Sequence, residues 1–328
     1  MSNIVQELVE KKIAHPPQWL PNNIHYLTMM GSVAYGVSSD TSDCDVYGFG
    51  IPPKDEIFPH LRGEIIGFGT QKHRFGQYQE HHLKDEFANA GKGKEYDLTI
   101  YNIVDYFQLI MKNNPNMIDS LFTPDNCVLH ITRIGTMVRE KRRIFLHKGC
   151  WHTFKGYAYA QMKKLGNKQR QSSKRQEMVE KYGMDLKFAY HIVRLLNEVE
   201  QIMVEGDLDL MRNREQLKAI RRGDWTEEQI QDYFTKKESE LETVYNNSKL
   251  PWGPDEAEIK ALLLECLEEH YGSLSKCIVV EDRAVQGLRE VESVLTRFGD
   301  VLHGQPSPTA SSDHHDSHLL GTEEAEPE

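Results

Sequence analysis

The chain has 328 residues, of which 39% are hydrophobic and 27% charged, as in soluble globular proteins. It contains no run of about 18 apolar residues, so we expect no membrane-spanning segment. The net charge is −11, but residues 305–328 hold six acids and neither Lys nor Arg, which leaves a mildly acidic remainder. The overall charge therefore does not predict a nucleic-acid binder, although local basic segments can still serve as one.

The cysteines and the first residues predict a cytoplasmic protein with reduced thiols. Five cysteines are scattered along the chain, and none forms a Cys-x-x-Cys pair, so neither a disulfide framework nor a zinc site is expected. The segment MSNIVQELVEKK lacks the apolar core and the small-residue cleavage site of a secretion signal.

The first part of the chain alternates between helix and strand patterns, which predicts an α/β (α+β) fold with a small mixed sheet. Residues 3–13 are expected to form an amphipathic helix that ends at Pro16-Pro17. Residues 60–94 contain six glycines and many polar residues, and we interpret them as a long irregular insertion. Three strands are expected, at residues 25–30, 45–51 and 96–101.

From about residue 102 the apolar spacing becomes helical. Asn114 is the expected N-cap, and Pro115 the first residue, of a helix that runs to Phe122. Longer helices are expected at about 130–144, 150–165, 184–205, 213–221, 226–246 and 255–270. We predict three parts: an α/β domain over residues 1–125, a mostly helical domain over 126–302, and a disordered acidic tail over 303–328.

The most informative segment reads GSVAYGVSSDTSDCDVYG, over residues 31–48. A strand that ends at Gly31-Ser32 at a helix start presents backbone N–H groups and a small hydroxyl, which is an arrangement that binds phosphate. Asp43 and Asp45 are two residues apart, so on a strand both carboxylates share one face, about 6–7 Å apart. Such carboxylates repel each other unless a cation lies between them, which favours Mg²⁺ or Mn²⁺.

Each half of this pattern is weak alone, because most Gly-Ser pairs are turns and most Asp-x-Asp segments are solvated loops. Their order, between two expected strands, makes the combination more specific. A third carboxylate on a neighbouring strand would complete a two-metal site. Asp97 is the candidate for it; Glu95 lies on the same face, and Asp105 is a weaker rival. Cys44, between the two acids, is expected to face the core.

The segment GSVAYGVSSDTSDCDVYGF resembles the Gly-Ser, short helix, Asp-x-Asp pattern of the DNA polymerase β-like nucleotidyltransferase superfamily. Its Ala-Tyr-Gly and Ser-Asp-x-Asp-x-x-Gly form is similar to a group of predicted nucleotidyltransferases of bacteria and large phages, some encoded beside RNA ligases. The resemblance extends through YDLTIYNIVDYFQLIMKNNPNMIDSLF into the helical half and covers roughly residues 25–235.

The resemblance implies the transfer of a nucleoside monophosphate from an NTP to an acceptor hydroxyl. It assigns Gly31 and Ser32 to the triphosphate. It also implies that Asp43, Asp45 and Asp97 are both the catalytic residues and the ligands of Mg²⁺ (or Mn²⁺). The helical domain would then form the far wall of the cleft, on the acceptor side.

Lys187, His191 and Arg194 are spaced i, i+4 and i+7, so they share one face of an expected helix. A solvated helix face, or a histidine in the core, explains this spacing equally well. The resemblance favours a cationic face that meets the nucleotide or the acceptor. We therefore assign these three residues, together with Tyr35, to nucleotide binding.

The acceptor is less constrained than the nucleotide. Two basic stretches, residues 139–148 and 163–175, are typical of solvated surfaces but also suit a nucleic acid, and the second contains an expected mobile loop. We prefer an RNA end as the acceptor, in repair or end modification. The alternative acceptors are a small molecule and a protein side chain. The alternative functions are a nucleotide-binding module without turnover and a scaffold. His81-His82 and residues 314–318 lack the spacing of a zinc site. The oligomeric state is not predicted.

Overall fold

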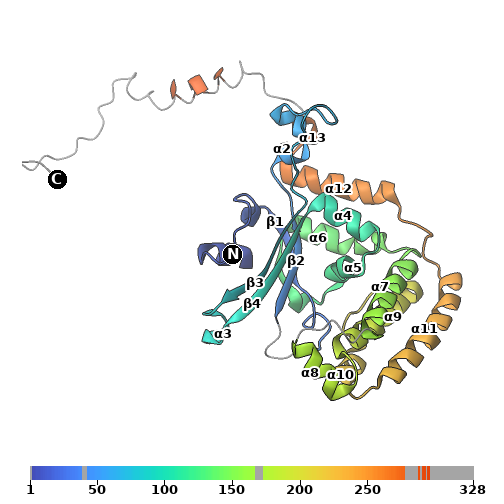
Figure 1. Ribbon diagram of the computed structural model, residues 1–328. Coiled ribbons are helices and arrows are strands. Elements are labelled where there is room, and N and C mark those ends of the chain that lie inside the picture. The colour runs from blue at the N-terminus through green and yellow to red at the C-terminus, as the bar shows by residue number, and fades with distance from the viewer. Residues whose placement is uncertain are drawn as a thin grey trace, which may run out of the picture. The chain divides into compact units, whose positions relative to one another are not determined.

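The computed structural model of the chain describes residues 2–38, 43–166 and 173–277, and a few residues between 287 and 295 (Figure 1). Residues 1–278 form one compact unit, and residues 279–328 form a second. The predicted disordered tail, residues 303–328, lies outside the described residues. In the part of the chain that is described, no helix is both long and apolar enough to cross a membrane.

A five-stranded mixed sheet in the order β3-β4-β2-β1-β5 confirms the predicted α/β (α+β) class. β1 is antiparallel to β2 and β5, whereas β2 and β4 are parallel and place Asp45 directly opposite Asp97. The three predicted strands are present. The sheet comprises β1 (Ile24–Met29), β2 (Cys44–Gly50), β3 (Gln77–Asp85), β4 (Lys94–Asn102) and β5 (Val128–Ile131).

The two edge strands differ from the prediction. Residues 60–94 are not wholly irregular, because β3 forms a nine-residue hairpin partner of β4. Residues 130 and 131 belong to β5, and the helix expected from residue 130 begins only at Arg133. An edge strand needs little apolar alternation, since much of its surface faces solvent. In β3, only Leu83 and Asp85 are buried.

The two faces of the sheet are covered differently. Helix α1 (Ile4–Glu10) has a capping box between Asn3 and Gln6, and it packs on the face that carries Leu27 and Val46. Cys44 lies in this core and is buried, as predicted. The opposite face carries Tyr26 and Phe49 and is covered by α4 (Ile103–Met111) and α5 (Pro115–Phe122).

Asn114 caps α5, and Pro115 is its first residue, as the sequence predicts. The core continues from the sheet into α9 (Leu186–Glu205), whose buried face packs against α7 (Cys150–Gly166), α10 (Arg214–Arg222) and α11 (Glu227–Asn247) (Figure 1). The same core includes residues on both sides of residue 125, such as Phe122 and Ile134. The remaining helices are α2 (Lys54–Ile57), α3 (Ala88–Gly91), α6 (Arg133–Glu140), α8 (Ser173–Tyr182), α12 (Glu256–Tyr271) and α13 (Leu274–Cys277), with 3₁₀ turns at Leu20–Asn22, Pro59–Arg62, Asp125–Cys127 and Arg142–Phe145.

Candidate nucleotide site

The turn after β1 lies directly against the acid on β2. Gly31 has a φ of +65°, a conformation that favours glycine, and a Cβ placed on it would lie 2.2 Å from Asp45 Oδ2. The peptide N–H of Met30 also donates to the carbonyl oxygen of Asp45, at 2.7 Å. The structure therefore brings the Gly-Ser turn and the Asp-x-Asp segment into contact.

Residues 31–36 form consecutive turns, and the expected short helix after Gly31-Ser32 is not present. The N–H of Gly36 donates to Val33 and that of Val37 donates to Ser32, at 3.0 and 2.9 Å. Both Gly31 and Gly36 have positive φ, which interrupts a right-handed helix within a few residues. The segment Gly31–Val37 is called the Gly-Ser turn below.

The acidic residues lie at adjoining strand positions. Burial raises the pKa of the Asp45 carboxyl, and the neighbouring Asp97 raises it further, whereas Lys187 opposes the shift. Asp43 is exposed and precedes β2, and Asp97 is partly exposed on β4. Like charges held this close are relieved by a bound divalent cation, and oxygen ligands suit Mg²⁺.

The Asp97 carboxylate accepts a hydrogen bond from the neighbouring strand β3. The backbone N–H of His82 donates to Asp97 Oδ1 at 2.7 Å, from a bulge in β3 where His82 has a φ of +58°. Among the described residues, no group of three or more His, Cys, Asp and Glu side chains forms a metal-binding cluster. The donor types fit a divalent ion, but the Asp97 carboxylate is already engaged by β3.

A cavity of about 690 Å³ opens over the Gly-Ser turn, a size within the usual range of small-molecule sites. Asp97 does not line it, although its strand neighbour Asp45 does. The predicted site residues that line the cavity are Gly31, Ser32, Tyr35, Asp43, Asp45, Lys187, His191 and Arg194, and the other lining residues are Met30, Tyr47, Asn116, Met178, Leu186, Tyr190 and Arg221.

Helix α9 supplies the wall that faces the acids. Its N-cap, Asp185, accepts hydrogen bonds from the backbone of Lys187 and Phe188, which fixes the first turn of the helix. Lys187 is exposed on this first turn, and His191 is half-buried with its ring 4.4 Å from that of Tyr190. The shared helix face predicted from the spacing is therefore present, and it faces the cavity.

Arg194, further along the same face, takes part in a buried network of hydrogen bonds and ion pairs. Its Nη1 contacts Asp119, and it donates to Glu198 Oε1 at 3.2 Å. The Tyr35 hydroxyl donates to Asp119 Oδ2 at 2.6 Å, and the Arg194 guanidinium lies 4.4 Å from the centre of the Tyr35 ring. Burial raises the pKa of both carboxyls, Asp119 and Glu198. Tyr35 and Arg194 thus meet at the base of the cavity wall.

A model of the RNA repair pathway DNA polymerase beta family matches residues 2–276. The chain belongs to that family. It is therefore a DNA polymerase β-like nucleotidyltransferase, as the opening motif indicates. Among solved structures, a nucleotidyltransferase-like protein from Exiguobacterium sibiricum has 10% identity over 90% of each chain, with a TM-score of 0.27. No curated protein matches the chain.

In this member of the RNA repair pathway DNA polymerase beta family, Arg221 is a cavity residue that the sequence pattern does not predict. This residue is near the end of α10 and lines the cavity. Its Nη1 donates to the carbonyl oxygen of Val37 at 2.6 Å, so it reaches the end of the Gly-Ser turn. The pair Arg221-Arg222 after the buried Ile220 was the available signal, but it does not say which arginine faces the site.

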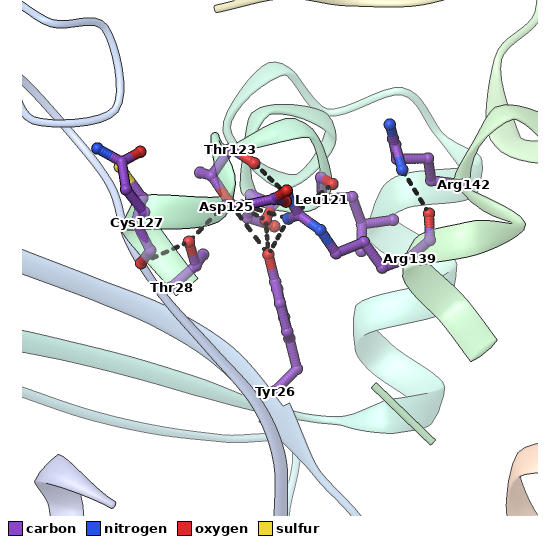
Figure 2. Close-up of polar contacts among 10 residues, drawn as sticks. Tyr26, Thr28, Leu121, Thr123, Asp125, Cys127, Arg139 and Arg142 are labelled. Atoms are coloured by element: carbon purple, nitrogen blue, oxygen red, sulfur yellow. Dashed lines mark hydrogen bonds and ion pairs between the residues drawn. The ribbon is translucent and has the colours of Figure 1, made fainter. Parts of the chain in front are cut away.

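The first basic stretch of this family member is used for internal contacts. Figure 2 shows Arg139 reaching from α6 to Tyr26 on β1, where its Nη1 donates to the tyrosine hydroxyl at 2.8 Å. Arg142 lies over the Phe122 ring, Arg143 pairs with Asp207, and Lys141 with Glu265. Arg139 and Arg142 are therefore engaged within the fold, whereas Lys141 and Arg143 keep largely exposed side chains in their ion pairs. In the second stretch, residues 167–172, which make up most of the expected mobile loop, lie outside the described residues, while Gly166 ends α7 and Ser173 begins α8.

Proposed function

We propose that this nucleotidyltransferase moves a nucleoside monophosphate from an NTP to an acceptor hydroxyl. The acceptor oxygen attacks the α-phosphorus, the bond from that phosphorus to the bridging oxygen breaks, and pyrophosphate leaves. The acceptor hydroxyl loses its proton to a base during the attack. The observation that carries the proposal is the contact between Gly31 and Asp45 at a cavity whose opposite wall carries Lys187.

Asp43, Asp45 and Asp97 would hold Mg²⁺ (or Mn²⁺). The raised pKa of Asp45 and its register with Asp97 support this assignment, because neighbouring carboxylates are stabilised by a cation between them. A bound ion would supply charge neutralisation on the phosphates. To contribute a ligand, Asp97 would exchange its hydrogen bond from the His82 N–H for the ion.

The chain's own groups would then position the triphosphate. The Gly-Ser turn presents backbone N–H groups and the Ser32 hydroxyl, and the glycine allows a phosphate to approach the backbone closely. Lys187 and His191 would contact the phosphates or the base from α9. Tyr35 and Arg194 would form the base of the same nucleotide wall. Positioned charges of this kind account for much of the catalysis of phosphoryl-type transfer.

An RNA end is the preferred acceptor, since the family description names an RNA repair pathway. The alternatives are transfer to a small molecule or a protein side chain, and nucleotide binding without turnover. They differ in where the transferred nucleotide is found after the reaction.

The test is to incubate the purified full chain with each α-labelled NTP and Mg²⁺, together with RNA oligonucleotides and an unrelated protein pool. Oligonucleotides that end in a 3′-hydroxyl are compared with the same sequences ending in a 2′,3′-dideoxy residue. Label on the hydroxyl-ended RNA alone supports a 3′-end acceptor. Label on protein redirects the proposal to a protein side chain. NTP binding with no transfer to any acceptor would contradict the enzyme role assigned to this site.

A further inference from the structure

Arg221 is a cation on the cavity wall, near the end of α10. It is exposed on α10, and its guanidinium lies 5.9 Å from the centre of the Tyr190 ring. Among the described residues it forms no ion pair with a carboxylate, whereas its neighbour Arg222 pairs with Asp224 at 2.7 Å. It donates a hydrogen bond to the Val37 carbonyl oxygen.

The charges around the cavity are separated by sign. Asp43 and Asp45 lie at the strand edge, while Lys187 and Arg221 come from the helices opposite. A triphosphate is a polyanion whose oxygens contact both a metal ion and cationic side chains. An arginine has five N–H donors in a planar fork, so a guanidinium that gives one donor to Val37 keeps others for phosphate oxygens.

The Gly-Ser turn is also held along its length by the helical part of the chain. The Tyr35 hydroxyl donates to Asp119 on α5. A Cβ on Gly36 would lie 2.9 Å from the Met211 side chain, just before α10. Arg221 fixes the next residue, Val37. Residues 35–37 of the Gly-Ser turn are therefore held in position by contacts with the helical part of the chain.

We propose that Arg221 binds the triphosphate tail of the nucleotide and, through the Val37 carbonyl, holds the end of the Gly-Ser turn in its binding conformation. This inference rests on the proposed function, because it assumes that the cavity takes an NTP. Lysine cannot fill both roles, since its single ammonium is a compact point charge without a planar fork.

The experiment measures equilibrium affinity for the NTP, NDP and NMP of one nucleoside in the full chain. It compares the wild type with Arg221→Ala, Arg221→Lys and Arg222→Ala. Arg222 is the matched control, one residue away on the same helix but paired with Asp224. Losing a charge-assisted contact should weaken NTP binding about 10- to 100-fold in Arg221→Ala. NMP binding should change less than about threefold, and Arg222→Ala should bind like the wild type.

Each other result has a distinct meaning. If the wild type binds no NTP, the proposed function fails and this inference fails with it. If the wild type binds NTP and Arg221→Ala binds it equally well, the inference on Arg221 alone is overturned. Equal losses of affinity for NTP and NMP in Arg221→Ala would show that Arg221 does not bind the triphosphate tail. Full recovery of NTP affinity in Arg221→Lys would overturn the double role.

Discussion

The Asp45 carboxylate occupies the space that a side chain at residue 31 would need. A Cβ on Gly31 would lie 2.2 Å from Asp45 Oδ2, far inside van der Waals contact, and Gly31 also has a positive φ. The glycine is therefore required twice, by its backbone conformation and by the acid beside it. The two halves of the sequence motif are one spatial unit.

Gly31→Ala should reduce nucleotidyl transfer by at least about 100-fold, because the new methyl group displaces Asp45 while the left-handed backbone is strained by about 1–2 kcal/mol. Steady-state transfer assays check the activity. Gly63→Ala is the control: its φ is +79°, but a Cβ there meets nothing within 4 Å. It should carry the backbone strain and keep full activity. Equal activities of the two variants would contradict the steric argument.

Asp43→Asn with Asp45→Asn should abolish transfer while leaving the fold intact. Since burial and Asp97 raise the pKa of Asp45, its charged form is disfavoured in the folded protein, and the neutral amide should not lower the melting temperature. Transfer at several Mg²⁺ concentrations and thermal unfolding are measured together. Asp105→Asn, on the exposed surface of α4, should behave like the wild type. Activity retained in the double variant would remove the metal assignment.

Tyr35→Phe should destabilise the protein by about 1–3 kcal/mol, since it removes one of the two donors to the buried Asp119 carboxylate and leaves Arg194 as the other. The Gly-Ser turn should also loosen, raising the KM for NTP more than it lowers kcat. Tyr159→Phe removes an equivalent hydroxyl, which donates to Glu238 at 2.7 Å on the surface, and should cost under about 1 kcal/mol. Chemical denaturation and kinetics separate the two effects, and an unchanged KM in Tyr35→Phe would argue against the support of the turn.

Stability should decrease as the pH falls from about 6.5 to about 4, in part through His25. Burial and the neighbouring His270 lower the pKa of His25 to about 4, so in this window the unfolded chain binds a proton that the folded protein does not. The loss from this one group is on the order of 3 kcal/mol and levels off below pH 4.

Denaturation at a series of pH values in wild type and His25→Gln checks this effect. Above pH 6.5 both states of His25 are neutral, so its titration adds no slope there. The variant should show a flatter pH dependence between 4 and 6.5. Parallel slopes in wild type and His25→Gln would refute the role of His25.

The sequence predicts helix starts well, because the residues that cap a helix lie within a few positions of its first turn. Asn114 and Pro115 mark the start of α5, and Thr226 starts α11 with a capping box. Asp45 and Asp97, which the motif and the strand pattern placed on neighbouring strands, lie on β2 and β4, whereas Asp43 precedes β2. The edge strands β3 and β5 were missed because their exposed residues show little apolar alternation.

The tertiary partners of the cavity residues could not be read from the chain. Arg194 was placed on the correct helix face, but its pairing with Asp119 joins residues 75 positions apart. The contact between His82 and Asp97 depends on a bulge that no residue pattern announces. Positions 221 and 222 are both arginine, so the sequence does not show which of the two faces the cavity. The packing of α10 decides it.

The hydrogen bond from Arg221 to Val37 spans 184 positions of the chain. Contacts of such long sequence separation form late, because the entropy of closing the intervening loop must first be overcome. During synthesis, the sheet can pair while α10 is still inside the ribosome, and at that stage the turn after β1 lacks one of its anchors. The strands of a nascent chain would therefore pair well before the chain is able to bind a nucleotide.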